Sequence, residues 1–294
     1  MKNSGKAAFA AAMLIFGTIG VLRRYIDLPS GALAMLRGFI GAGFLAALMF
    51  VQGKRPDFKK MGKRLVWLIV SGAGIGLNWM LLFEAYNHTS VATATLCYYM
   101  APVIVMLLSP VILKEKLTAR RIVCIIAAVI GMIPVSGLMS QQGFDVSEMK
   151  GVLLGLAAAA LYASVILMNK RITDVEPMDR TVVQLTAAAV VVMPYVFAAE
   201  NFSPLDLSWL SILLVLIAGI VHTGIAYALY FGAIPKLKAQ TVALASYIDP
   251  VFAVVLSAAV LGETMDLYGR LGAAVVIGAM MISELPEKNN EPRS

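Results

Sequence analysis

The sequence predicts an all-α membrane protein of ten transmembrane helices, arranged as two inverted five-helix repeats. The first observation is composition, because 60% of the residues are hydrophobic and only 14% are charged, whereas soluble domains carry about 25% charged residues. The second is that the apolar residues form long uninterrupted runs rather than amphipathic stripes. The third is an internal repeat that pairs two of these runs. A water-soluble fold of this length could not bury so much apolar surface.

Ten segments meet the length requirement for a spanning helix, which is about 20 mainly apolar residues. Turn and helix-breaking residues separate the segments, as at Pro29, Pro56 and Pro177. Because the loops are short, neighbouring helices must be antiparallel. The predicted spans are residues 6–23, 30–52, 64–86, 90–112, 119–139, 149–170, 178–199, 208–233, 239–261 and 267–285.

Lys and Arg residues are distributed unevenly between the two sides of the predicted membrane. Of the 24 such residues, Arg37 lies within a span, and Arg23, Arg24, Lys150 and Arg270 lie on one side; the others all lie on the opposite side. Basic residues in short loops favour the cytoplasm. We therefore expect a multi-pass protein of the bacterial inner (cytoplasmic) membrane with both termini cytoplasmic.

The internal repeat aligns residues 93–115 with residues 241–263 without gaps. Chance explains matches between apolar residues, but it does not easily explain Thr, Tyr, Pro, Ser and Glu in the same register. These matches pair Thr93 with Thr241, Tyr99 with Tyr247, Pro102 with Pro250, Ser109 with Ser257, and Glu115 with Glu263.

The repeat divides the chain into a first five-helix unit, 1–141, a second unit, 142–285, and a polar cytoplasmic tail, 286–294. An odd number of helices in each unit inserts the second unit upside down, which is a common plan of secondary transporters.

The residues of this repeat resemble the drug/metabolite transporter superfamily, EamA type, over essentially the whole chain. The resemblance is carried by the runs 93–103 and 114–117, by their counterparts 246–252 and 261–263, and by Arg37 within 36–39. It implies a five-plus-five inverted topology, a central cavity and traffic in small metabolites, often outward.

Several other classes of protein are excluded by the motifs and their spacing. No catalytic, nucleotide-binding or metal-binding motif is present in the sequence, so we expect no enzyme, no cofactor and no metal site. Cys97 and Cys124 lie in apolar runs without metal-ligand spacing. The basic clusters form no continuous face, so no nucleic acid partner is expected. The glycines of the run 72–76 are expected to let a spanning helix approach its neighbour closely.

Ionisable residues inside spans are costly and therefore informative, at about 3 kcal/mol for a charge at the centre of the bilayer. Arg37, Glu84 and Asp249 are candidates for proton coupling or charge pairing. Asp249 precedes Pro250, where a proline loosens the helix; alternatively, Asp249 caps a helix, or pairs with Arg37 or with a backbone group. Glu84 can equally extend to the membrane interface. Pro102 and Pro250 are the predicted hinges.

Polar and aromatic side chains at helical spacing are expected to face inward, because a lipid-facing hydroxyl would lack a partner. The pattern leaves open whether they form packed core or the wall of a cavity. The candidate cavity residues are Asn78, Trp79, Tyr98, Tyr99, Tyr162, Asn169, His222, Tyr227, Tyr230 and Tyr247.

These features together predict a secondary transporter that exports a small metabolite, an amino acid or a related amphipathic compound, by alternating access. Two alternatives use the same fold: uptake of a quaternary amine or another nutrient, and a lipid-carrier flippase. The expected partners are the small-molecule substrate and the lipid bilayer, with proton coupling, in a monomer or a weak homodimer.

Overall fold

The structure is a computed structural model that describes residues 2–54, 61–114, 117–136, 146–172, 175–200, 208–237, 241–242 and 245–285. All regular secondary structure in these ranges is helical, which confirms the predicted all-α class. The predicted tail 286–294, the predicted boundary between residues 141 and 142, and Glu115 lie outside the described residues.

Within the described residues, seven of the predicted spans are long and apolar enough to cross a membrane, judged by length and composition. They are formed by α1 (Lys2–Gly17) with α2 (Ile19–Arg23), α3 (Ser30–Val51), α5 (Arg64–His88), α6 (Val91–Tyr98) with α7 (Ala101–Ile112), α9 (Val146–Arg171), α10 (Pro177–Ala199), and α11 (Trp209–Gly219) with η1 (Ile220–Ile225) and α12 (Ala226–Ala233).

The remaining predicted spans correspond to shorter helices. These are α8 (Ala119–Val135), α14 (Ile248–Leu261) and α15 (Leu267–Ser283), and a short 3-10 turn, η2 (Ile234–Lys236), follows α12. The prediction of one continuous helix over residues 239–261 differs from the structure, because a turn at Ser246 and Tyr247 precedes α14.

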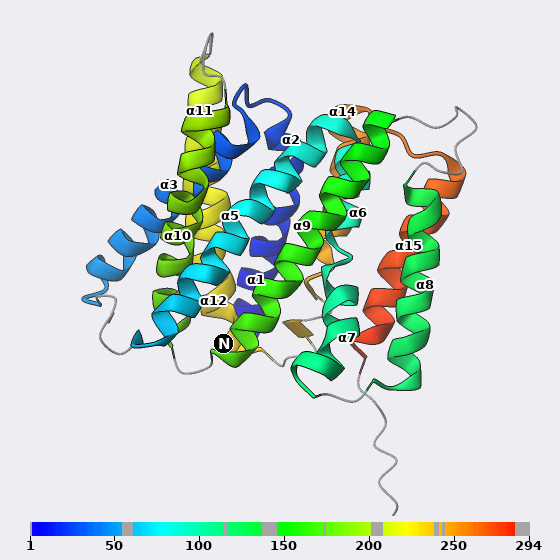
Figure 1. Cartoon of the computed structure of the whole chain (residues 1–294), viewed down its shortest axis with the longest axis horizontal. Coiled ribbons are helices and arrows are strands. Elements are labelled where there is room, and N and C mark those ends of the chain that lie inside the picture. Colours follow the sequence, from blue (N-terminus) through cyan, green and yellow to red (C-terminus); the bar gives the residue numbers. More distant parts are fainter. Residues whose placement is uncertain are drawn as a thin grey trace, which may run out of the picture.

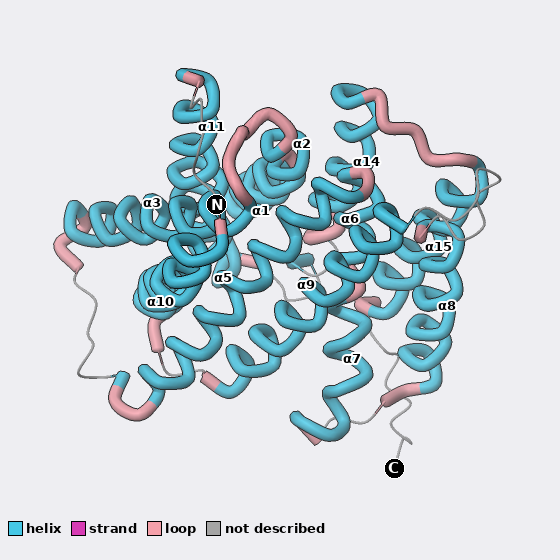
Figure 2. The backbone as a smooth tube through the Cα atoms, turned by 45° about the horizontal axis from the view of Figure 1, so that its top comes forward, coloured by secondary structure: helices cyan, strands magenta, loops and turns pink. Residues whose placement is uncertain are grey.

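The helices form a bundle in which α1 begins and α15 ends at the same end, the lower end in Figure 1. At one edge α8 packs on α15, and on the other side α10 packs on α3 and α5. Between them, α6 and α14 contact each other, and α14 also contacts α1 (Figure 2). The helices α5 and α9 cover one face of this centre (Figure 1).

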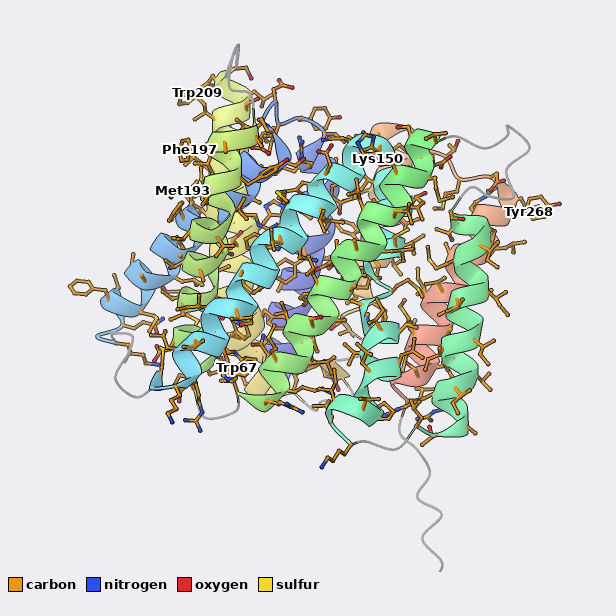
Figure 3. All side chains as sticks on the ribbon, in the orientation of Figure 1. Trp67, Lys150, Met193, Phe197, Trp209 and Tyr268 are labelled. Atoms are coloured by element: carbon orange, nitrogen blue, oxygen red, sulfur yellow. The ribbon has the colours of Figure 1, made fainter. Side chains whose placement is uncertain are left out.

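The outer surface of the bundle carries apolar side chains of the kind that face lipid. Val111 is 81% exposed and Val123 is 64% exposed. Trp67 and Trp209, which are 58% and 77% exposed, lie toward opposite ends of the bundle (Figure 3). Tryptophan is enriched at both membrane interfaces, so their positions agree with a membrane-spanning bundle.

Two of the helical segments are interrupted at equivalent places in the internal repeat. In the first, α6 ends at Tyr98 and α7 begins at Ala101; in the second, α14 begins at Ile248, directly after Tyr247. Pro102 and Pro250 therefore lie in the first turn of α7 and of α14, where the missing proline N–H costs no helical hydrogen bond. Their role as hinges stays a prediction.

Glycines allow α5 to lie directly against α10, as predicted for the run 72–76. A Cβ atom added at Gly72 would lie 2.6 Å from the Gln184 carbonyl oxygen, and one added at Gly76 would overlap the Ala188 carbonyl. The helix backbones are therefore too close for any larger residue without movement.

We predict that Gly76→Ala destabilises the protein by about 1–3 kcal/mol, the usual cost of overpacking, and lowers its melting temperature in detergent. The matched control is Gly43→Ala in α3, because a Cβ atom at Gly43 meets nothing within 4 Å. In this control the higher helix propensity of alanine, worth up to about 1 kcal/mol, should leave stability unchanged or raise it. Equal melting temperatures for the two variants would contradict the close contact between α5 and α10.

Candidate functional site

Three of the predicted tyrosines meet where α6 ends beside α9. The rings of Tyr98 and Tyr162 stack with their centroids 5.3 Å apart, and Tyr99 meets Tyr98 edge-on at 5.9 Å. Tyr162 lies one turn after Ala158 and Ala159, which are both fully buried, so its ring faces the interior of the bundle. Nevertheless Tyr162 keeps 37% of its surface exposed.

The other two tyrosines of the predicted set that face this region come from α12. Tyr227 contacts Phe16 of α1 edge-on, with centroids 5.4 Å apart, and Tyr230 contacts Phe9 at the same distance. Tyr227 and Tyr230 also lie close enough to Tyr162 to interact with it electrostatically. We call Tyr98, Tyr99, Tyr162, Tyr227 and Tyr230 the tyrosine group.

Asp249, at the start of α14, belongs to this group as well. Its carboxylate accepts a hydrogen bond from the Tyr99 hydroxyl, and Tyr98 and Tyr162 lie within electrostatic range. Among the described residues no Lys or Arg forms an ion pair with Asp249. The alternative that Asp249 pairs with Arg37 is therefore wrong for this structure, because each side chain is held by an uncharged partner.

Arg37 is held by aromatic rings and a hydroxyl. Its guanidinium lies 4.2 Å from the centroid of Trp79 and 5.7 Å from that of Phe83, and its Nε atom donates to Thr223 Oγ1 at 2.7 Å. Arg37 is only 5% exposed. Cation–π contacts are strongest when they are desolvated, so this arrangement stabilises a buried charge and joins α3 to η1.

The π-helix η1 was not predicted from the sequence. It places two consecutive side chains toward different helices: His222 Nε2 lies 2.7 Å from Thr18 Oγ1, and Thr223 meets Arg37. Gly219, directly before this segment, and Gly224, within it, pack closely against Ile40 and Phe44 of α3. Single π-helical turns are frequent at functional sites, but no simple sequence signal distinguishes them from an α-helix.

The other predicted cavity residues lie in helix contacts outside the tyrosine group. Asn78 donates to the Ala158 carbonyl at 2.6 Å and joins α5 to α9. Asn169 accepts from Gln184 at 2.8 Å. Trp79 lies beneath Arg37, and Tyr247 is 5% exposed within an apolar cluster.

Glu84 lies in a different region, near the end of α5. Its carboxylate accepts from Ser30 at 2.8 Å and from Asn87 at 2.9 Å, and it pairs with His88 at 3.2 Å. Glu200, which sequence reasoning missed, lies nearby and accepts from the backbone N–H groups at the start of α3. Burial raises the pKa of the Glu200 carboxyl, although these N–H groups favour its charged form.

The chain is similar to known proteins along most of its length. The sequence profile of the EamA-like transporter family matches residues 3–137 and again residues 149–284. The chain is 29% identical to the uncharacterized transporter YxxF of Bacillus subtilis, over 96% of this chain and 90% of that protein. It is 27% identical to the protein RarD of Salmonella typhimurium, over 75% of this chain and 73% of that protein.

An archaeal relative and a solved structure extend the comparison. An uncharacterized transporter of Archaeoglobus fulgidus is 25% identical over 95% of this chain and 96% of its own length. A crystal structure with 20% sequence identity matches with a TM-score of 0.65 and covers 96% of both chains, which shows a shared fold. The names of the family and of most of these relatives denote transporters rather than enzymes.

We predict that Thr223→Val destabilises the protein by about 1–3 kcal/mol, because it removes the hydroxyl that accepts from Arg37 while keeping the shape of the side chain. Thr186→Val is the matched control, since Thr186 is exposed and its hydroxyl bonds only within its own helix. The readout is the melting temperature of each variant in detergent. An equal effect of both substitutions would contradict the structural role of the Arg37–Thr223 contact.

Proposed function

Because the chain belongs to the EamA-like transporter family, we propose that it is a secondary transporter that exports a small metabolite, an amino acid or a related amphipathic amine, by alternating access. The observation that carries this proposal is a partly buried carboxylate, Asp249, held by a tyrosine at a helix break, with further tyrosines nearby. The proposed transport takes place across the inner membrane of a bacterium.

The chemistry of the tyrosine group suits an organic ammonium group. Aromatic faces attract cations, and Asp249 supplies a negative charge that no described Lys or Arg neutralises. Hydroxyl groups on the same wall would fix the orientation of the bound molecule. The accessible surface that Tyr162 keeps in the interior supports a cavity rather than packed core at this place.

The arrangement in two halves is part of the proposal. The separate matches of the family profile to residues 3–137 and 149–284 support two repeats, and the helix breaks at equivalent places support them independently. We infer ten spans, in which α8, α14 and α15 complete the seven long ones, and two inverted units meeting between α6 and α14. The excess of basic residues at one end supports cytoplasmic termini.

Alternating access would use the interrupted helices. Rocking of the two units about the starts of α7 and α14, at Pro102 and Pro250, would open the tyrosine group to one side at a time. A proton on Asp249 would replace the ammonium group of the substrate after release, which couples transport to the proton gradient. A monomer or a weak homodimer stays the expected assembly.

Uptake of a quaternary amine is a second candidate, favoured by the same ring contacts. A methylated ammonium has no N–H donors, so aromatic faces would provide most of its binding energy. A lipid-carrier flippase is expected to have a polar groove facing lipid. The groove of about 520 Å³ between α8 and α15 is instead lined by apolar side chains together with Arg120. The flippase therefore gains less support.

We predict that Asp249→Asn removes the dependence of transport on the pH gradient and reduces gradient-driven transport at least about tenfold, which corresponds to about 1.4 kcal/mol. The substrate is first identified by a thermal-shift screen of amino acids and amines. Transport is then measured in proteoliposomes with and without a pH gradient. Glu84→Gln is the control for loss of a carboxylate, and it should keep the gradient dependence because Glu84 lies outside the tyrosine group.

Two results would contradict this proposal. The first is Asp249→Asn transport with the same response to the gradient as the wild type. The second is a wild-type rate that does not change when the gradient is collapsed, which would exclude proton coupling and leave a facilitative carrier. Competition by choline, together with inward accumulation, would favour the quaternary amine instead.

A further inference from the structure

A second polar pocket lies at the opposite end of the bundle from the start of α1, between α3, α5, α9 and α10. We call it the outer pocket. Its volume is about 490 Å³, and its polar lining consists of Arg23, Ser30, Glu84, Asn87, Lys150 and Glu200. Figure 3 shows Lys150 near the beginning of α9, beside the end of α5. Neither the tyrosine group nor Asp249 contributes to its wall.

The two carboxylates of the outer pocket already have structural partners. Glu200 accepts from the backbone N–H groups of Gly31 at 2.7 Å and Ala32 at 2.8 Å, and so caps the start of α3. Glu84 accepts hydrogen bonds from the Ser30 hydroxyl and the Asn87 amide. Each carboxylate oxygen can accept more than one hydrogen bond, so both acids can still receive a ligand's N–H group.

Arg23 is the charged group in the outer pocket with an unsatisfied hydrogen-bond donor. Its Nη1 atom donates to the Ile26 carbonyl at 2.8 Å and its Nη2 atom to Ser30 Oγ at 3.4 Å. Its buried Nε atom has no acceptor among the described residues, although Arg23 is only 6% exposed. An unsatisfied donor on a buried charged group is costly. Because this Nε atom is covered by protein atoms, Arg23 offers a ligand in the pocket its positive charge rather than this N–H group.

The remaining lining defines the shape of such a ligand. Lys150 is exposed and adds a second positive charge on the same pocket wall. Leu81, Leu154 and Tyr195 provide an apolar surface. The pocket therefore offers two cations, two anions and an apolar wall, so a neutral ligand with separated charges matches it better than a simple anion does.

We propose that the outer pocket binds a small zwitterion of the amino acid class with an apolar side chain. The carboxylate lies toward Arg23 and Lys150, the ammonium group toward Glu84, and the side chain against Leu81, Leu154 and Tyr195. This inference rests on the proposed function, because the pocket is a holding site for the transported molecule at the end of the bundle opposite the start of α1. It also adds to that function, since the molecule would occupy two separate sites.

The test uses photo-leucine, an amino acid that crosslinks to its neighbours on illumination, with the purified full-length protein. We expect crosslinks to peptides containing Leu81, Leu154 or Tyr195, identified by mass spectrometry. Leucine should compete for these crosslinks, whereas leucinamide and N-acetyl-leucine, which lack one of the two charges, should not. Lys150→Glu should reduce this labelling about tenfold, as expected for loss of a close charge pair.

The controls separate the outer pocket from the tyrosine group. Lys63→Glu, at the opposite end of α5, should leave the labelling unchanged, and so should Asp249→Asn. Because Arg23 is buried and its replacement can unfold the protein, Lys150→Glu serves as the main variant. Arg23→Gln is included only if its melting temperature stays close to that of the wild type.

Four results would overturn the proposal. Three of them are an absence of crosslinks in the outer pocket, equal competition by N-acetyl-leucine, which would indicate an anion site, and labelling that Lys150→Glu does not change. The fourth is the loss of every crosslink in Asp249→Asn, which would exclude the outer pocket while the proposed transport function would stand. Gradient-driven transport remains an independent readout of that function.

Discussion

The structure depends on one constraint: inside a bilayer, the backbone polar groups of a chain must find their hydrogen bonds within the protein. Uninterrupted helices meet this requirement, and the apolar runs of the sequence supply them. Irregular backbone at membrane depth is then tolerated only in the protein interior or beside a cavity. The breaks before α7 and α14, and the π-helix η1, are such places, and their side chains include Tyr99, Thr223 and Asp249.

The same constraint explains how the buried Arg37 and the partly buried Asp249 are held. Arg37 and Asp249 do not pair with each other; Arg37 uses aromatic rings and Thr223, and Asp249 uses the Tyr99 hydroxyl. A mutual ion pair would leave each charge committed to the other. Uncharged partners stabilise each charge less than an ion pair would, so Asp249 can still bind a ligand or a proton. This is the physical basis for proposing a binding site at the tyrosine group.

Much of the fold could be predicted from the sequence because bilayer thickness sets a length that apolar runs reveal directly. The starts of seven long helices were predicted to within about three residues, and Pro102 and Pro250 marked the regions of the breaks. The π-helix could not be predicted, because no simple residue pattern distinguishes it from an α-helix, and the close packing of Gly219 and Gly224 against α3 is visible only in the structure. The partners of Asn78 and Asn169 also depend on which helices become neighbours, and helical periodicity does not report that. Glu200 was missed because it lies just after an apolar run, where a carboxylate looks like an ordinary loop residue.

The central claim is that the tyrosine group lines a hollow that water can reach rather than packed core or a lipid-facing surface. It is tested most directly with a spin label at Tyr162→Cys, in a protein whose buried Cys97 and Cys124 are replaced by alanine. We predict that a water-soluble nickel complex broadens its spectrum more than oxygen does, with the reverse order at Val123→Cys on the lipid-facing side of α8. Oxygen-dominated broadening at Tyr162→Cys, as at Val123→Cys, would contradict the account.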